Sequence, residues 1–163
     1  MTAITTATAQ KALVLYYSET GTTKTVAEEL QQQLGADIEA VEAVEPYTGN
    51  FQETIQRGQR EMQSGQWPAI KPLKSAIKNY DVIFLGYPNW CGTMPMALWT
   101  FLESHDFTDK TIYPFCTHEG SGVGHSLEDI HALCPTAKLG KSLALLGTTI
   151  EDAEDDIRRW LRD

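Results

Sequence analysis

Short apolar runs alternate with helical patterns along nearly the whole chain, and this alternation limits the fold more than any other feature. The clearest runs are 12–17 and 82–85, which have the length and composition of strands buried on both faces. Further strands are expected within 38–44, at 111–116 and at 143–146. Strands that alternate with helices predict a doubly wound α/β fold, with a five-stranded parallel sheet and helices on both of its faces.

The helices are recognised from apolar residues that recur three or four positions apart. In the first, Val26, Ala27 and Leu30 share one face, and Gly35 is placed to end the helix. Four more are expected at 51–62, from about 95, at 126–133 and at 150–161. Residues 46–72 are the least regular part of the chain. They could form a lid over a site, a dimer surface or ordinary packing.

The charge balance limits the choice of partners. The chain has 13 Lys and Arg residues against 22 Asp and Glu, a formal net charge of −9. Such a chain repels phosphate backbones and anionic lipid, so we expect neither a nucleic-acid nor a membrane partner. No apolar run approaches the ~18 residues that a membrane crossing needs. A protein partner with a basic surface remains compatible with this charge.

The cysteines and the N-terminus suggest a cellular setting. Cys91, Cys116 and Cys134 are odd in number, and no two of them have the spacing of a zinc site or a redox pair. We therefore expect free thiols in a reducing, cytoplasmic environment. Residues 1–10 contain no Lys or Arg and no apolar stretch, so we expect a disordered tail and not a secretory signal. Residues 11–163 would then form a single domain.

Three polar loops follow predicted strands, at 18–23, 86–92 and 117–122. They are rich in Ser, Thr, Gly, Trp and Asn. The carboxyl ends of parallel strands meet at one edge of a sheet, and ligands of such folds bind at that edge. The sequence therefore predicts one binding site built from these three loops.

The first loop has the composition of an anion site. Hydroxyl groups at 18, 20, 22 and 23 surround one glycine directly before a helix. A helix N-terminus offers free N–H groups and partial positive charge, which suit a terminal phosphate. The simpler interpretation is an ordinary helix cap. The loop is not a nucleotide-hydrolysing Walker A motif, because Thr23 and not glycine precedes Lys24.

The second loop offers an aromatic surface. Trp90, next to Tyr87, Pro88 and Asn89, could lie against a planar ring. Alternatively, it is a core tryptophan that seals the edge of the sheet.

The third loop matches no catalytic or dinucleotide motif. Glu119 stands where a nucleophile elbow needs glycine, and His125 stands where a dinucleotide fingerprint needs its last glycine. A zinc motif that began at His118 would need histidine at Gly122. What remains is a pliable loop whose backbone N–H groups can approach the polar edge of a ligand. His118 either belongs to that edge or is an ordinary surface histidine.

Taken together and in order, these segments resemble the flavodoxin family. The pattern S-x-T-G-x-T at 18–23 is similar to the phosphate-binding loop of flavodoxins. Residues 80–95 resemble the ring-binding loop of a flavodoxin-like subgroup that carries P-x-W-x-G-x-x-P, and 115–122 resemble the third loop of that subgroup. The likeness spans about residues 11 to 162.

The resemblance implies the strand order 2-1-3-4-5, known for flavodoxins, and non-covalently bound FMN as cofactor. The residues that would hold the phosphate are Ser18, Thr20, Gly21, Thr22 and Thr23. Those that would flank the isoalloxazine are Pro88, Asn89, Trp90, Cys91 and Gly92, with Trp90 stacked on one face. The pyrimidine edge would meet Thr117, His118, Glu119, Gly120, Ser121 and Gly122. Two positions depart from the family, which commonly has a second aromatic residue at Cys91 and Asn at Thr22.

The resemblance favours a monomeric, low-potential carrier of single electrons, with a basic reductase or oxidoreductase as its redox protein partner. Gly92 could let a peptide rearrange and accept a hydrogen bond from flavin N5–H. The alternative is an FMN-dependent NAD(P)H or quinone oxidoreductase on the same fold, although no basic cluster for a dinucleotide lies near the loops. A phospho-accepting receiver is set aside, because the acidic residues that it needs after the first and third strands are missing.

Overall fold

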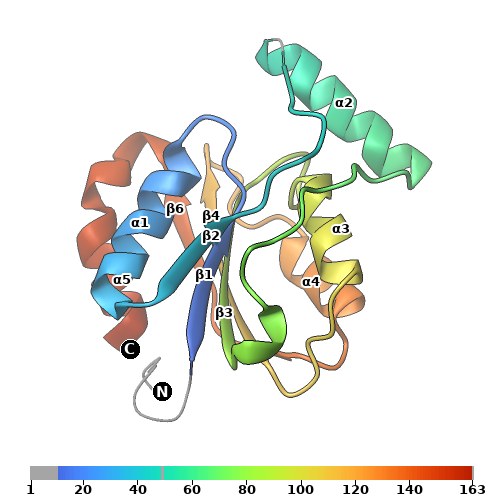
Figure 1. Ribbon diagram of the computed structural model, residues 1–163. Helices are drawn as coiled ribbons and strands as arrows, with labels where there is room; N and C mark the ends of the chain where they lie inside the picture. The colour runs from blue at the N-terminus through green and yellow to red at the C-terminus, as the bar shows by residue number, and fades with distance from the viewer. Residues whose placement is uncertain (1–10, 49, 163) are drawn as a thin grey trace.

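A parallel sheet forms the centre of the protein, whose computed structural model describes residues 11–48 and 50–162. Its strands lie in the order β2-β1-β3-β4-β5, and β6 also pairs with β4 (Figure 1). The strands are β1 (Ala12–Tyr16), β2 (Asp37–Ala40), β3 (Val82–Pro88), β4 (Thr111–His118), β5 (Lys138–Leu139) and β6 (Leu143–Leu146). The expected order 2-1-3-4-5 is confirmed. The tail expected at residues 1–10 lies outside the described residues.

The fifth position of the sheet is shared by two short strands, where the sequence pattern predicts one. Ile112 of β4 pairs with Leu139 of β5, and Phe115 pairs with Leu143 of β6. Residues 140–142 of the neighbouring segment therefore lie beside Tyr113 and Pro114. Proline has no N–H to donate to a ladder, which accounts for an interruption at this point of the edge.

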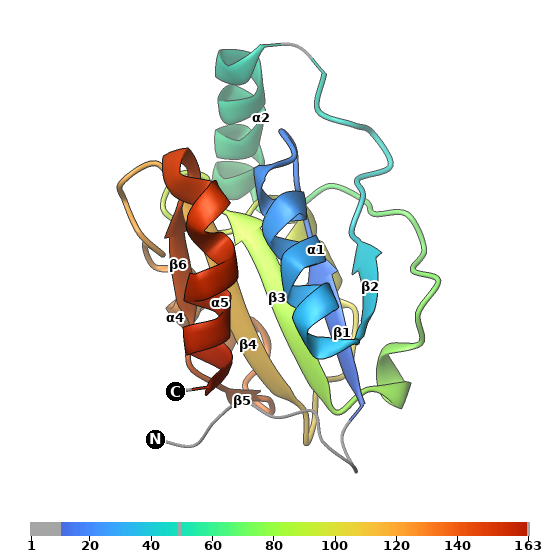
Figure 2. The same ribbon diagram turned by 90° about the vertical axis from the view of Figure 1, so that its left-hand side faces the viewer.

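Helices cover both faces of the sheet. They are α1 (Thr22–Leu34), α2 (Phe51–Ser64), α3 (Met96–Glu103), α4 (Ser126–Leu133) and α5 (Ala153–Arg162), with short 3-10 turns η1 (Ile77–Asn79) and η2 (Gly147–Asp152). Helices α1 and α5 lie on one face and α3 and α4 on the other (Figures 1 and 2). None of the helices in 11–48 and 50–162 combines the length and apolar character that a membrane crossing requires.

Alternation along the strands divides the interior into two cores. In β1, Leu13 and Leu15 belong to the core that includes apolar side chains of α3 and α4. Val14 and Tyr16 point the other way, into the core shared with α1 and α5. All four side chains are buried, as expected for a strand covered on both faces.

Helix α2 covers neither face of the sheet but stands above its carboxyl edge (Figures 1 and 2). The Asn50 side chain caps its N-terminus by accepting the Glu53 N–H, and Gly65 ends it in a left-handed conformation. The segments before and after α2 pair outside the main sheet, through an antiparallel bridge between Ala43 and Ile70. The irregular region 46–72 is thus built around a helix that lies over the predicted site.

Candidate functional site

Hydrogen bonds join the three predicted loops at the carboxyl edge of the sheet. The Thr23 and Thr117 hydroxyls are 2.8 Å apart and link the first loop to the third. The Asn89 backbone N–H donates to the Thr117 carbonyl at 2.9 Å, and its side-chain amide donates to the Gly122 carbonyl at 2.8 Å. The structure therefore places these loops together, as the strand pattern predicts.

The first loop leaves the N-terminus of α1 open. Gly21 stands at the N-cap position with φ of 96°, and no side chain caps the helix. The Ser18 hydroxyl accepts the Gly21 N–H at 3.1 Å, which closes the loop on itself. Thr20 is exposed, and its hydroxyl lies 3.5 Å from that of Thr22. An uncapped helix N-terminus with hydroxyls beside it is suited to an anion.

Thr23 differs from the other hydroxyl residues of this loop. Its side chain is 1% exposed, and its hydroxyl is committed to Thr117. The expectation that this hydroxyl holds a phosphate does not fit its buried position. The side chain instead fastens the first loop to the third, and only its backbone N–H belongs to the open end of α1.

The second loop ends in a tight hairpin. Trp90 and Thr93 exchange two backbone hydrogen bonds of 2.8 and 3.0 Å, with Cys91 and Gly92 between them. Both central residues have positive φ, 54° at Cys91 and 86° at Gly92, as in a type I′ turn. A left-handed conformation is uncommon for cysteine, and here it leaves the Cys91 side chain exposed at the tip of the turn.

Trp90 lies beneath this turn and not on the surface. It is 9% exposed, and its ring meets Tyr17 and Tyr47 edge-on, with centroids 5.5 and 5.2 Å away. Gly58 of α2 lies so close that a Cβ there would be 3.7 Å from the indole. Of the two interpretations of Trp90, the structure has the core tryptophan, with α2 packed over it.

An ionic network holds α2 in this place. The Tyr47 hydroxyl donates to the Glu61 carboxylate at 2.5 Å, and Arg57 pairs with the same carboxylate at 3.1 Å. The Arg57 guanidinium also lies over the Tyr47 ring, 3.8 Å from its centroid. Burial, and then the bond to Glu61, raise the pKa of Tyr47 above its ordinary value. The phenol therefore stays protonated and available as a donor at neutral pH.

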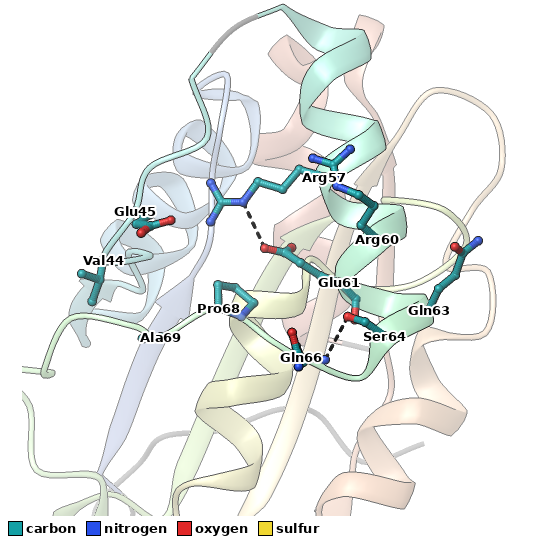
Figure 3. A pocket seen from close by; sticks show the side chains of 10 residues that line it. All are labelled: Val44, Glu45, Arg57, Arg60, Glu61, Gln63, Ser64, Gln66, Pro68 and Ala69. Carbon is teal, nitrogen blue, oxygen red and sulfur yellow. Dashed lines mark hydrogen bonds and ion pairs between the residues drawn. The ribbon is translucent and has the colours of Figure 1, made fainter.

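A cavity of about 910 Å³ lies between α2 and the segments that flank it (Figure 3). Its lining residues are Val44, Glu45, Arg57, Arg60, Glu61, Gln63, Ser64, Gln66, Pro68 and Ala69. None of these belongs to the three loops, and no motif in the sequence predicts the cavity. It depends on α2 standing away from the sheet, which no local pattern reveals.

The third loop, 117–122, adopts backbone conformations that only glycine accepts readily, as expected. Gly120 and Gly122 have positive φ, and the Gly120 N–H donates to Nδ1 of His118 at 2.9 Å. Glu119 and Ser121 are exposed beside them. A further glycine, Gly124, lies outside the predicted set but contacts the second loop.

Gly124 lies directly against the second loop. A Cβ on it would be 2.1 Å from the Gly92 carbonyl oxygen, so the two backbones touch. The next residue donates its backbone N–H to the same oxygen at 2.7 Å. In the sequence, Gly124 belongs only to an incomplete dinucleotide fingerprint, and no local pattern predicts this contact.

The three cysteines differ sharply in access. Cys116 and Cys134 are buried, and burial raises the pKa of their thiols to about 12 and about 11. Cys91 is exposed at the hairpin tip. Only the Cys91 thiol is therefore open to reagents in the folded protein.

We expect a maleimide to modify one thiol per folded chain, at Cys91, and all three thiols in denaturant. A ligand seated on the hairpin would shield Cys91, so the FMN that the sequence resemblance implies should slow this modification if it binds there. The measurement is a time course by mass spectrometry with and without FMN, and Cys91→Ser is the control that should abolish fast labelling. Unchanged labelling in FMN-saturated protein would place the ring elsewhere.

The strand order and the loop cluster define a doubly wound α/β protein with a candidate ligand site at the carboxyl edge of its sheet. A family model described as flavodoxin matches residues 11–163. The chain belongs to the flavodoxin family. The assignment of its second loop to the P-x-W-x-G-x-x-P subgroup stays a prediction.

Solved structures agree with the assignment of the chain to the flavodoxin family. A crystal structure described as a candidate flavoprotein from Bacteroides eggerthii is 35% identical, covers 93% of this chain and 96% of its own, and has a TM-score of 0.81. A flavoprotein from Lactobacillus acidophilus in complex with FMN is 22% identical, with coverage of 93% and 99% and a TM-score of 0.73. At that identity, the second likeness shows the fold alone.

One curated relative matches over part of its length. A flavodoxin from Haemophilus influenzae is 27% identical over 103 residues, which are 61% of this chain. The match spans 45% of that relative's length.

Proposed function

We propose that this protein binds FMN without a covalent bond and carries single electrons at low potential between redox partners. The observation that carries the proposal is the open N-terminus of α1, which lies at the same sheet edge as the Cys91–Gly92 turn and the loop 117–122. One structural relative, from L. acidophilus, is described in complex with FMN. When bound, FMN would supply the redox chemistry.

The first loop fits a phosphate better than any other part of the site. The uncapped N–H groups at the start of α1 would bind its oxygens, helped by the hydroxyls of Thr20 and Thr22. Gly21, at φ of 96°, lets the chain turn sharply into the helix. These residues would fix the position of the cofactor.

The ring would meet the turn and not an open tryptophan face. With Trp90 covered by Tyr47 and α2, the exposed parts of the second loop are Cys91 and its neighbouring backbone. Both backbone groups of Gly92 already have partners, since its N–H donates to Asn89 Oδ1 at 2.9 Å and its carbonyl accepts the His125 N–H at 2.7 Å. A peptide rearrangement at Gly92 would break one of these bonds.

The charge of the chain favours a low potential and a basic partner. A net charge of −9 disfavours further negative charge on a bound cofactor, which makes full reduction harder. The same charge would steer a basic reductase or oxidoreductase to the site at a rate that falls with ionic strength. We propose that the protein meets this partner as a monomer.

A second candidate function is an FMN-dependent NAD(P)H or quinone oxidoreductase. The observation that favours it is the cavity of about 910 Å³ beside α2, which is large enough for an organic substrate. Tyr47 joins the two places, since its hydroxyl bonds Glu61 of the cavity wall and its ring packs against Trp90. The wall carries the cations Arg57 and Arg60, which the loops lack, together with Glu45 and Glu61, and Arg57 is paired with Glu61 (Figure 3).

Stepwise anaerobic reduction of the FMN-loaded protein separates the two functions. A carrier of single electrons should show a long-wavelength absorption band that rises and then falls. Direct bleaching without that band would contradict the carrier and favour the oxidoreductase. A protein that takes up no FMN would exclude both.

A further inference from the structure

His125 lies beside the predicted ring-binding turn. Its backbone N–H donates to the Gly92 carbonyl, and its imidazole lies on the side of Gly92 where a side chain would project. A Cβ added at Gly92 would be 3.3 Å from both Cδ2 and Nε2 of that ring. The imidazole therefore lies directly beside the Cys91–Gly92 turn.

Asp129 orients this imidazole. Nδ1 of His125 lies 2.6 Å from Asp129 Oδ2, one helical turn further along α4. The same carboxylate oxygen accepts the Thr93 hydroxyl at 2.5 Å, and the Asp129 side chain is 19% exposed. Because a carboxylate only accepts, Nδ1 carries the hydrogen in this bond. The orientation of the imidazole is thus fixed by the Asp129 carboxylate, which is itself held by Thr93 of the hairpin.

The other imidazole nitrogen, Nε2, is available to a ligand. Nε2 has no hydrogen-bond partner among residues 11–48 and 50–162, and the His125 side chain is 56% exposed. An oriented imidazole with one bonded and one open nitrogen is the arrangement of a general acid or base. Because His125 lies at the Cys91–Gly92 turn, its Nε2 lies near the proposed position of the isoalloxazine.

Holding the loops together does not require this side chain. The His125 backbone already ties α4 to Gly92, and the Thr93 hydroxyl already ties Asp129 to the hairpin. Among the described residues, the imidazole adds no further hydrogen bond between α4 and the hairpin. A chemical role accounts for its placement better than a structural one.

We propose that His125, oriented by Asp129, transfers a proton to an electron acceptor that must take up protons with its electrons, of which quinones are the common organic class. The proposal rests on the proposed function and deepens the second candidate. It locates the acceptor at the Cys91–Gly92 turn and not in the cavity beside α2, which His125 does not line. A quinone becomes a hydroquinone by gaining two electrons and two protons. When bound and reduced, FMN would supply both electrons and one proton. Protonated Nε2 supplies the second, becomes neutral, and regains its proton from water.

The test compares two acceptors in a single turnover. FMN-loaded protein is reduced anaerobically with dithionite and mixed rapidly with benzoquinone, which needs protons, or with ferricyanide, which does not. We expect His125→Gln to slow reoxidation by benzoquinone by about a hundredfold. The rate with ferricyanide should change less than about twofold. His131→Gln, an exposed histidine on the same helix, is the matched control and should leave both rates unchanged.

A second readout does not depend on electron transfer. Nitrogen NMR of the protein without FMN should show the His125 hydrogen on Nδ1 in the wild type. Asp129→Asn should change the ratio of the Nδ1–H and Nε2–H tautomers. An equal loss with both acceptors, or an unchanged benzoquinone rate, would overturn the proton-transfer role. Failure of the wild type to bind FMN would instead overturn the proposed function, so the two failures are distinguishable.

Discussion

Gly86→Ala is expected to lower the free energy of unfolding by about 3 kcal/mol. Gly86 lies in the central strand β3, and a Cβ there would be 2.1 Å from Cζ of Phe115. The Phe115 ring is 1% exposed and packed between the sheet and the α1–α5 layer, so it has no free space to move into. The measurement is urea unfolding followed by circular dichroism.

Gly58→Ala provides the matched control. A Cβ at Gly58 would meet Trp90 at 3.7 Å, an ordinary contact, and alanine favours a helix over glycine by roughly 1 kcal/mol. We expect this variant to be unchanged or more stable by up to about 1 kcal/mol. A Gly86→Ala protein as stable as the Gly58→Ala protein would mean that the β3–β4 packing described above is wrong.

Gly124→Ala is expected to have the next largest effect, and it acts on the site. The added methyl group would meet the Gly92 carbonyl at 2.1 Å, with backbone on both sides of the contact. Gly124 also has φ of +57°, which disfavours any side chain. We expect a loss of about 2 kcal/mol in stability and at least a tenfold weaker FMN affinity, about 1.4 kcal/mol, because the hairpin must move.

Gly35→Ala separates backbone strain from the loop contact. Gly35 has φ of +66° but open space around it, and it ends α1 far from the carboxyl edge. We expect it to lose about 1 kcal/mol of stability through strain and to bind FMN as the wild type does. Equal FMN affinities in the Gly124→Ala and Gly35→Ala proteins would contradict the role of the Gly92–Gly124 contact. Fluorescence titration measures both affinities.

The parts of the fold that the sequence revealed are those with local signals. The apolar runs that became β1 and β3 are visible in the residues themselves, and parallel-sheet geometry then brings their following loops to one edge. The convergence of 18–23, 86–92 and 117–122 follows from this rule. It did not require knowledge of any long-range contact.

The parts that were missed depend on partners distant in the chain. The Thr23 hydroxyl is committed to Thr117, 94 residues away, and only the folded structure removes it from the set of free hydroxyls. Trp90 is covered by Tyr47 and by α2, whose position above the sheet edge no periodicity reveals. The His125–Asp129 spacing is visible in the sequence, but its meaning depends on the contact with Gly92.

The most direct test of the proposed FMN site is a titration of the cofactor-free protein with FMN and, separately, with riboflavin, followed by quenching of flavin fluorescence. Riboflavin has the same ring but no phosphate, so it cannot use the open N-terminus of α1. Two charged hydrogen bonds of about 1.5 kcal/mol each correspond to roughly a hundredfold in affinity. We therefore expect FMN to bind about a hundred times more tightly than riboflavin. Equal affinity for the two flavins, or no binding of FMN, would contradict the site described here.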